Sequence, residues 1–232
     1  NISVGADSVF DFNGANGVIP LLKGSLQVET AITISAWIKT TVTGARQTII
    51  SNDNVSSNPA GADAGRCWNF LINGQNLDFV VRQENGATAS GPFNQVLSSG
   101  VNVADDNWHH VVGVWDGTSN TNSQKVFVDG ILRGQGTPSF TQPIRHWSPN
   151  IPTIGDAAGQ TAFWDFEGEM SNIQIWEAGL TYGTVSSLGD TAGGEIAELY
   201  NNGQPLMTGT QPQENNLKGW WKLNQSANWE AD

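Results

Sequence analysis

Apolar positions in the middle of the chain form three short runs that are separated by two polar turns. Residues 110–115 carry apolar side chains on both alternating registers, which predicts a strand buried on nearly both faces. Asp116-Gly117 opens a turn rich in Asn, Ser and Thr, and residues 125–128 are again β-branched and aromatic. Asp129-Gly130 is then a two-residue hairpin signal before the returning strand Ile131-Leu132. Such a meander cannot bury its apolar faces alone, so the pattern predicts a sandwich of two sheets.

Further strands are predicted before this meander. Residues 33–40 alternate apolar and polar side chains, the pattern of a strand that the core half covers, and residues 47–51 are expected to pair with it. Residues 67–72 and 77–82 flank Asn73-Gly74, the strongest hairpin signal in the chain. The predicted fold class is therefore all-β, an antiparallel two-sheet β-sandwich.

The last third of the chain predicts one helix and a closing strand. A short helix is expected near residues 195–200, ended by Asn201-Asn202-Gly203, and the last strand at residues 217–223. Sandwiches of this length often form one unit, so residues 1–223 are predicted to be a single domain and residues 224–232 a tail or linker to a following segment.

Composition and charge limit the possible partners. The 232-residue chain has 10 Lys and Arg against 22 Asp and Glu, a formal net charge of −12, and so lacks the basic stripe that nucleic-acid binding requires. The acidic balance leaves carboxylates for hard cations such as Ca²⁺. No run of 18 apolar residues occurs, so no membrane insertion is predicted. Cys67 is the one cysteine and cannot form an internal disulfide, and the start at Asn1 leads us to expect an excerpt of a longer polypeptide.

Two motifs point to a known family. The motif W-H-H-V-x-x-x-W-D-G at residues 108–117, followed by V-x-V-D-G at residues 126–130, is similar to the core of laminin G-like and pentraxin-like modules. Further blocks resemble the same family in order, at residues 10–14, 32–38, 154–156, 166–176 and 195–201. The resemblance covers roughly residues 8–223 and implies a jelly roll of the concanavalin A-like lectin and glucanase type, but it is nearly silent on the ligand.

The resemblance also implies a candidate Ca²⁺ site. In pentraxin-like relatives, carboxylates of the long loop after the early strands meet residues that follow an I-G-x motif. The matching positions here are Asp53 and Asp63 in the loop, with Asp156, Gln160 and Asp165 after Ile154-Gly155. The chain departs from the family because Asp156 is followed by Ala157-Ala158-Gly159 instead of a dense acidic cluster, so solvated turn residues are the alternative.

A glycan would be bound by exposed aromatic rings beside polar side chains. Trp147 and Trp164 lie in or beside loops, as does Trp68, and the candidate carbohydrate-binding set is Trp147, Trp164, Asn150 and Gln160. The alternative is that loop tryptophans fold back as lids over the edge of the sandwich. Family core positions hold the tryptophans that we expect to be buried, which are Trp37, Trp108, Trp115 and Trp176.

A catalytic role is not predicted. Glycosidases that share this sandwich carry carboxylates at alternating strand positions, and the nearest run here is Asp165, Glu167 and Glu169. The resemblance instead assigns Phe166-x-Gly168 to a turn, so that Glu169 begins the next strand. His109 and His110 are adjacent on a strand and point in opposite directions, so they cannot hold one metal together and are interpreted as a structural pair.

Two classes of function remain. The first is a non-catalytic recognition module that binds a glycan or glycosylated surface, with Ca²⁺ as an assisting ion, in a larger secreted or surface protein. The second is a structural module of a virion, such as a phage fibre or capsid decoration protein, or an adhesin repeat that contacts other domains or subunits. Both imply an extracellular location or a cell or virion surface.

Overall fold

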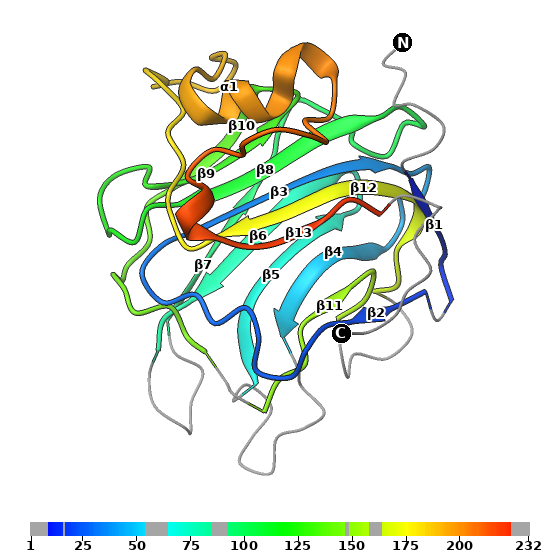
Figure 1. Cartoon of the computed structure of the whole chain (residues 1–232). Coiled ribbons are helices and arrows are strands. Elements are labelled where there is room, and N and C mark those ends of the chain that lie inside the picture. Colours follow the sequence, from blue (N-terminus) through cyan, green and yellow to red (C-terminus); the bar gives the residue numbers. More distant parts are fainter. Residues whose placement is uncertain are drawn as a thin grey trace.

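The computed structural model describes residues 9–15, 17–53, 65–84, 92–146, 149–157 and 164–223, which form two antiparallel β-sheets facing each other (Figure 1). The strands of sheet A are β1 (Phe10–Asn13), β3 (Ile32–Lys39), β8 (His109–Trp115), β9 (Gln124–Val128), β10 (Ile131–Gly136), β12 (Glu167–Trp176) and β13 (Leu217–Trp221). They are ordered β1-β12-β3-β8-β9-β10, and β13 also pairs with β12. The strands of sheet B are β2 (Ile19–Pro20), β4 (Arg46–Asp53), β5 (Arg66–Asn73), β6 (Asn76–Arg82), β7 (Phe93–Leu97) and β11 (Thr153–Ile154). Their order is β2-β11-β4-β5-β6-β7, so the predicted all-β sandwich is confirmed.

The predicted central meander forms as expected. β8 pairs with β9, and β9 pairs with β10, in the middle and at one edge of sheet A. Asp129 and Gly130 make the turn between β9 and β10 with φ of 53° and 71°. Positive φ at both central residues is the geometry of the tight hairpin turn that matches strand twist, which explains why the turn carries Asp-Gly.

One predicted pairing is wrong. Residues 47–51 lie in β4, which pairs with β5 and β11 in sheet B, whereas residues 33–40 supply β3, which pairs with β8 and β12 in sheet A. The chain crosses from one sheet to the other between β3 and β4. Alternation shows which residues of a strand face the core but does not specify the neighbouring strand, so the sequence pattern could not reveal this crossover.

The tryptophans occupy two kinds of position. Trp37, Trp115 and Trp176 are fully buried, as expected. Trp68, which we placed in or beside a loop, is also fully buried, because its position in β5 faces the core between the sheets. Trp108 was expected in the core, but it immediately precedes β8 and is half-buried at the surface.

The outer face of sheet A is covered by the chain itself. The helix α1 (Gly194–Tyr200) lies over this face in Figure 1, and its Ile196 and Leu199 join Val112 and Phe127 of the sheet in a second apolar cluster. The helix ends at Tyr200, and the next residue, Asn201, caps it with a left-handed φ of 45°. The 3₁₀ turns η1 (Asn201–Gly203) and η2 (Glu214–Asn216) follow. The predicted helix is therefore confirmed. Among the described residues, no helix covers the outer face of sheet B.

The closing strand lies next to the opening strand, as both pair with β12. β1 pairs with the first half of β12, and β13 pairs with the second half. Residues 224–232, predicted to be a tail or linker, lie outside the described residues. None of the helices that the structure describes is long and apolar enough to cross a membrane.

Candidate functional site

Alternation along β6 places polar side chains on the outer face of sheet B. Phe79 and Val81 point into the core between the sheets. Because successive side chains of a strand point to opposite faces, Asp78, Val80 and Arg82 lie on the other face. These three residues line a hollow in the part of the sandwich that no described helix covers.

This hollow, which we call the outer hollow, has a volume of about 190 Å³. Four adjacent strands and one loop contribute to it. Its lining consists of Arg46 and Asp53 from β4, Arg66 and Leu71 from β5, Asp78, Val80 and Arg82 from β6, Phe93 and Gln95 from β7, and Trp164.

Trp164 lies at the β4 side of the outer hollow, and the guanidinium of Arg46 lies over its ring. Its main-chain carbonyl accepts a hydrogen bond of 2.9 Å from the N–H of Thr48, which fixes the loop against β4. The guanidinium carbon of the exposed Arg46 is 4.9 Å from the centre of the half-buried indole ring. A cation over an aromatic face is attracted by the ring quadrupole, so each side chain restricts the other.

Phe93 forms a second aromatic wall at the β7 side. Its ring is 53% exposed, and the guanidinium carbon of Arg82 lies 4.8 Å from its centre. The strands β4 and β7 are three strand spacings apart, which corresponds to about 14 Å across the sheet. The outer hollow is therefore bounded by two aromatic rings, each of which contacts an arginine.

Asp78 lies at the floor of the outer hollow and is 1% exposed. Its Oδ2 accepts hydrogen bonds from Gln95 Nε2 at 2.6 Å and Asn73 Nδ2 at 3.3 Å, whereas its Oδ1 has no hydrogen-bond partner. Burial raises the pKa of Asp78, and the hydrogen bonds and the positive charge of Arg46 oppose that rise. The floor thus combines a fixed carboxylate with an acceptor atom that the described chain does not use.

Asp53, a predicted metal ligand, lines the outer hollow at the other end of β4. Its Oδ1 accepts a hydrogen bond of 2.7 Å from the N–H of Cys67. Burial raises the pKa of Asp53 to about 6, although the positive charges of Arg82 and Arg66 lower it in part. The charge of this carboxylate therefore changes in the mildly acidic range.

A separate hollow lies at one end of sheet A, next to the start of β8. This acidic hollow has a volume of about 530 Å³ and is lined by Lys39, Asp105, Asp106, Asn107, Trp108, His109 and Asp129. A neighbouring hollow of about 300 Å³ shares Lys39 and Asp106 and extends to Glu167 and Glu169.

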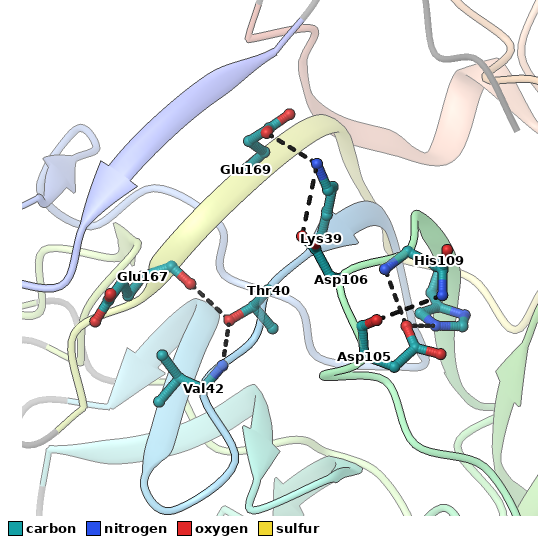
Figure 2. Close-up of polar contacts among 9 residues, drawn as sticks. Lys39, Thr40, Val42, Asp105, Asp106, His109, Glu167 and Glu169 are labelled. Carbon is teal, nitrogen blue, oxygen red and sulfur yellow. Dashed lines mark hydrogen bonds and ion pairs between the residues drawn. The ribbon is translucent and has the colours of Figure 1, made fainter. Parts of the chain in front are cut away.

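The charged groups of the acidic hollow are paired with one another (Figure 2). The Nζ of Lys39 lies 3.4 Å from Glu169 Oε1 and 3.7 Å from Asp106 Oδ1. His109 contacts two carboxylates, with Nδ1 at 2.7 Å from Asp129 Oδ2 and Nε2 at 3.0 Å from Asp105 Oδ1. These contacts hold the loop before β8 against the neighbouring strands. The outer hollow, with its exposed aromatic and arginine side chains, is the stronger candidate for a site.

The two histidines have separate environments, in agreement with their opposite directions on the strand. Burial lowers the pKa of His109, but the hydrogen bonds and charges of Asp129 and Asp105 outweigh it, so the pKa is raised. His110 is fully buried, and burial lowers its pKa to about 4. Its Nε2 is 2.8 Å from the hydroxyl of Ser35.

The three carboxylates considered for catalysis also have separate environments. Glu167 begins β12, two residues earlier than expected, and its main-chain carbonyl accepts a 2.6 Å hydrogen bond from the hydroxyl of Thr40 (Figure 2). Glu169 is paired with Lys39. Asp165 is close enough to Asp156 for its charge to raise the pKa of Asp156, after the larger effect of burial.

The other predicted site residues fall into three groups. Trp164 lies in the outer hollow. Asn150 is 1% exposed, and its Nδ2 donates to the main-chain carbonyls of Asn52 at 2.8 Å and Gly65 at 2.7 Å, so it ties the end of β4 to the residue before β5. The remaining predicted residues lie outside the described part of the chain; they are Trp147, Gln160 and Asp63.

The described residues do not supply a complete set of metal ligands. Asp156 and Asp165 are neighbours, and Asp156 Oδ1 already accepts the N–H of Ala157 at 2.6 Å. Within the described ranges, no group of three or more His, Cys, Asp or Glu side chains is placed to hold a metal. Ca²⁺ takes 6–8 oxygen ligands, so the described residues alone do not fit it.

Sequence reasoning missed most of the outer hollow. Arg46, Asp78, Arg82, Phe93 and Gln95 are each polar or exposed positions of strands, and their alternation marks the face on which they lie. The order of β4 to β7 in the sheet brings them together, and that order was not evident from the pattern.

Comparisons with known proteins agree with the fold. The sequence model of the family described as the concanavalin A-like lectin/glucanases superfamily matches residues 13–186. No curated protein sequence matches the chain.

Several solved structures share the fold. A candidate carbohydrate-binding protein from Bacteroides ovatus is 15% identical with a TM-score of 0.62, over 96% of this chain and 54% of that protein. This chain thus spans about half of that protein's length. The heptameric SAP-like pentraxin of Limulus polyphemus is 17% identical with a TM-score of 0.52, over 77% of this chain and 80% of its own. The CBM40 of the Ruminococcus gnavus IT-sialidase, solved with α2,3 sialyllactose, is 14% identical with a TM-score of 0.53, over 75% of this chain and 92% of its own.

Proposed function

Because the chain belongs to the concanavalin A-like lectin/glucanase superfamily, we propose that it is a non-catalytic module that binds a glycan in the outer hollow. Two of the solved neighbours are described by carbohydrate binding, and one contains a bound sialyllactose. The observation that carries the proposal is the pair of aromatic rings, Trp164 and Phe93, on either side of a polar floor.

The chemistry of a sugar matches these walls and this floor. A pyranose ring has apolar C–H faces that pack on aromatic rings, and hydroxyl groups at its edge that require hydrogen-bond partners when water is removed. Trp164 and Phe93 offer ring faces, whereas Asp78 and Gln95 offer acceptor and donor atoms between them. Trp164 lies against β4 and Phe93 lies on β7, and the spacing of about 14 Å between these two strands suits an oligosaccharide better than one sugar.

The environment of the two carboxylates in the outer hollow supports a binding role. Glycoside hydrolysis needs an acid and a nucleophile or base on either side of the scissile bond. Asp53 and Asp78 are both more than nine-tenths buried and hold hydrogen bonds with Cys67 and with Gln95. Each carboxylate thus already has a hydrogen-bond partner within the chain that fixes its orientation, which supports a role in orienting a ligand.

The wider setting belongs to the same proposal. A glycan-binding module of this family would act as part of a larger secreted or surface protein, and Ca²⁺ would assist it through Asp156 and Asp165. The alternative is a structural module of a virion or adhesin, which would use apolar surface to contact other subunits. The exposed Leu22, at 73%, is the most exposed of the large apolar side chains of the described residues.

A glycan array tests the proposal, run with and without EDTA. We expect the wild-type protein to bind a defined group of glycans and Trp164→Ala to lose at least about tenfold in affinity, because it removes a stacking face. Trp108→Ala is the matched control, since Trp108 is also half-buried but lines the acidic hollow, and it should bind as the wild type does. Binding that survives Trp164→Ala would place the site elsewhere. Absence of binding to every glycan would favour the structural alternative.

A further inference from the structure

Basic side chains are concentrated in the outer hollow. The chain has ten Lys and Arg and a net charge of −12, yet three arginines line this one hollow of about 190 Å³. They come from three adjacent strands, with Arg46 on β4, Arg66 on β5 and Arg82 on β6. Two carboxylates, Asp53 and Asp78, share the hollow, so its formal charge is positive on a strongly acidic protein.

Arg46 is arranged to meet a ligand at the mouth of the hollow. It is exposed, and its guanidinium lies over the ring of Trp164. The guanidinium carries five N–H donors, and contact with an aromatic ring does not use them as hydrogen-bond donors, so they can donate to a ligand. Among the described residues, Arg46 forms no ion pair. Its positive charge lowers the pKa of Asp78, but the Oδ2 of Asp78 accepts its hydrogen bonds from Gln95 and Asn73.

A neutral sugar does not require such an arrangement. Hydroxyl groups are satisfied by neutral donors and acceptors, and removing water from a guanidinium is costly unless an anion compensates. A carboxylate or a sulfate accepts two N–H bonds from the planar fork of an arginine, and such charge-assisted bonds are about twice as strong as neutral ones. On a protein of net charge −12, a locally positive hollow also attracts an anion that the rest of the acidic surface repels.

From these observations we infer that the outer hollow selects glycans that carry an anionic group, a carboxylate or a sulfate, and that Arg46 on Trp164 is the residue that binds it. The inference rests on the proposed glycan-binding function and adds the class of ligand. Trp164 supplies the apolar wall for the sugar ring and holds Arg46 in place, while Arg82 on Phe93 extends the positive surface to the far side.

An array of matched pairs tests the inference, in which neutral oligosaccharides are printed beside their sialylated, uronic acid-bearing and sulfated counterparts. We expect binding to the anionic member of a pair at least about tenfold tighter than to the neutral member. The carboxylate and sulfate arms show which anion is preferred. Equal binding to both members of the pairs would overturn the inference and leave the proposed function standing, whereas no binding to any glycan would overturn both.

Arg46 variants locate the selectivity. With the best pair in calorimetry, Arg46→Gln should lose about tenfold for the anionic glycan and clearly less for the neutral one. Arg46→Lys keeps the charge without the planar fork and should lose less. Arg133→Gln, on β10 of the other sheet, is the matched control and should match the wild type. Equal losses for both glycans in Arg46→Gln, in a variant that melts as the wild type does, would contradict the role of Arg46.

Discussion

The guanidinium carbon of Arg46 lies 4.9 Å from the centre of the Trp164 ring, which joins the first residue of β4 to the segment that leads into β12. The two residues are 118 positions apart in the sequence and come from different parts of the fold. Their contact makes one wall of the outer hollow, and it predicts that they act together on a ligand.

Removing the ring should therefore weaken the arginine contact as well. We expect Trp164→Leu to lose about tenfold in affinity for an anionic glycan, and Trp164→Phe to lose less because it keeps an aromatic face under Arg46. In the double variant Arg46→Gln/Trp164→Leu, the loss should be smaller than the sum of the single losses, measured as binding free energies by calorimetry. Strictly additive losses would contradict the coupling.

Asp53 predicts a pH dependence of binding. The groups around its carboxylate are Arg82, Arg66, the N–H of Cys67 and Asn69, and the pKa of Asp53 is raised to about 6. The carboxylate is ionised at pH 7.5 and opposes an anionic ligand, whereas at pH 5 it holds a proton and no longer does. Affinity for an anionic glycan should thus rise by about threefold between pH 7.5 and pH 5.

The control for this prediction is Asp53→Asn, which keeps the side-chain acceptor but removes the charge. It should bind anionic glycans at pH 7.5 as tightly as the wild type does at pH 5, with a flat profile. The variant should also gain stability relative to the wild type as pH rises, because a carboxyl group whose folded pKa lies above its unfolded value costs stability once it ionises. An unchanged pH profile in Asp53→Asn would show that another group is responsible.

His109 predicts a pH dependence of folding. The folded pKa is raised above 6.5, since the charged imidazole donates to Asp129 and Asp105 at once. The stability from this contact is fully present below pH 6.5 and is lost as pH rises through the folded pKa. Urea unfolding should show that His109→Gln costs more at pH 5.5 than at pH 8.5, by about 1 kcal/mol. A cost that is equal at both values, or larger at pH 8.5, would refute this account of the contact.

Calcium remains a prediction from the family resemblance. If Asp156 and Asp165 bind Ca²⁺ together with residues outside the described ranges, the ion stabilises the native state alone. At 100 times its dissociation constant it would add about 2.7 kcal/mol, a rise of roughly 5–10 °C in Tm. Asp156→Asn should remove the rise. A melting curve that Ca²⁺ leaves unchanged would contradict the site.

The sequence predicted the elements whose signals are local. The Asp129-Gly130 turn forms where the pattern placed it. The hairpin predicted at Asn73-Gly74 also forms, but its turn lies one residue later, because Asn73 is the last residue of β5 and pairs with Asn76. The short helix was also predicted from a local signal, the Asn201 that follows it and adopts a left-handed φ. The family motifs then indicated the sandwich as a whole.

The candidate site depends on pairings that no local signal contains. Asp78 and Gln95 meet because β6 pairs with β7, and Trp164 reaches Arg46 across the edge of β4. Trp164 was predicted as a site residue from its loop position, but Arg46, which lies over its ring, was not predicted. The wrong placements of Trp68 and Trp108 have the same origin, since the depth of a tryptophan depends on which face of which sheet receives it.

The most direct test of the central claim follows the indole N–H signals of the ten tryptophans by NMR during titration with the best glycan from the array. The Trp164 signal is identified by its absence from the spectrum of Trp164→Phe. The account predicts that this signal shifts progressively with ligand, while that of Trp108 in the acidic hollow, identified in the same way, stays in place. A shift confined to Trp108, or saturation with glycan that leaves Trp164 unmoved, would contradict binding in the outer hollow.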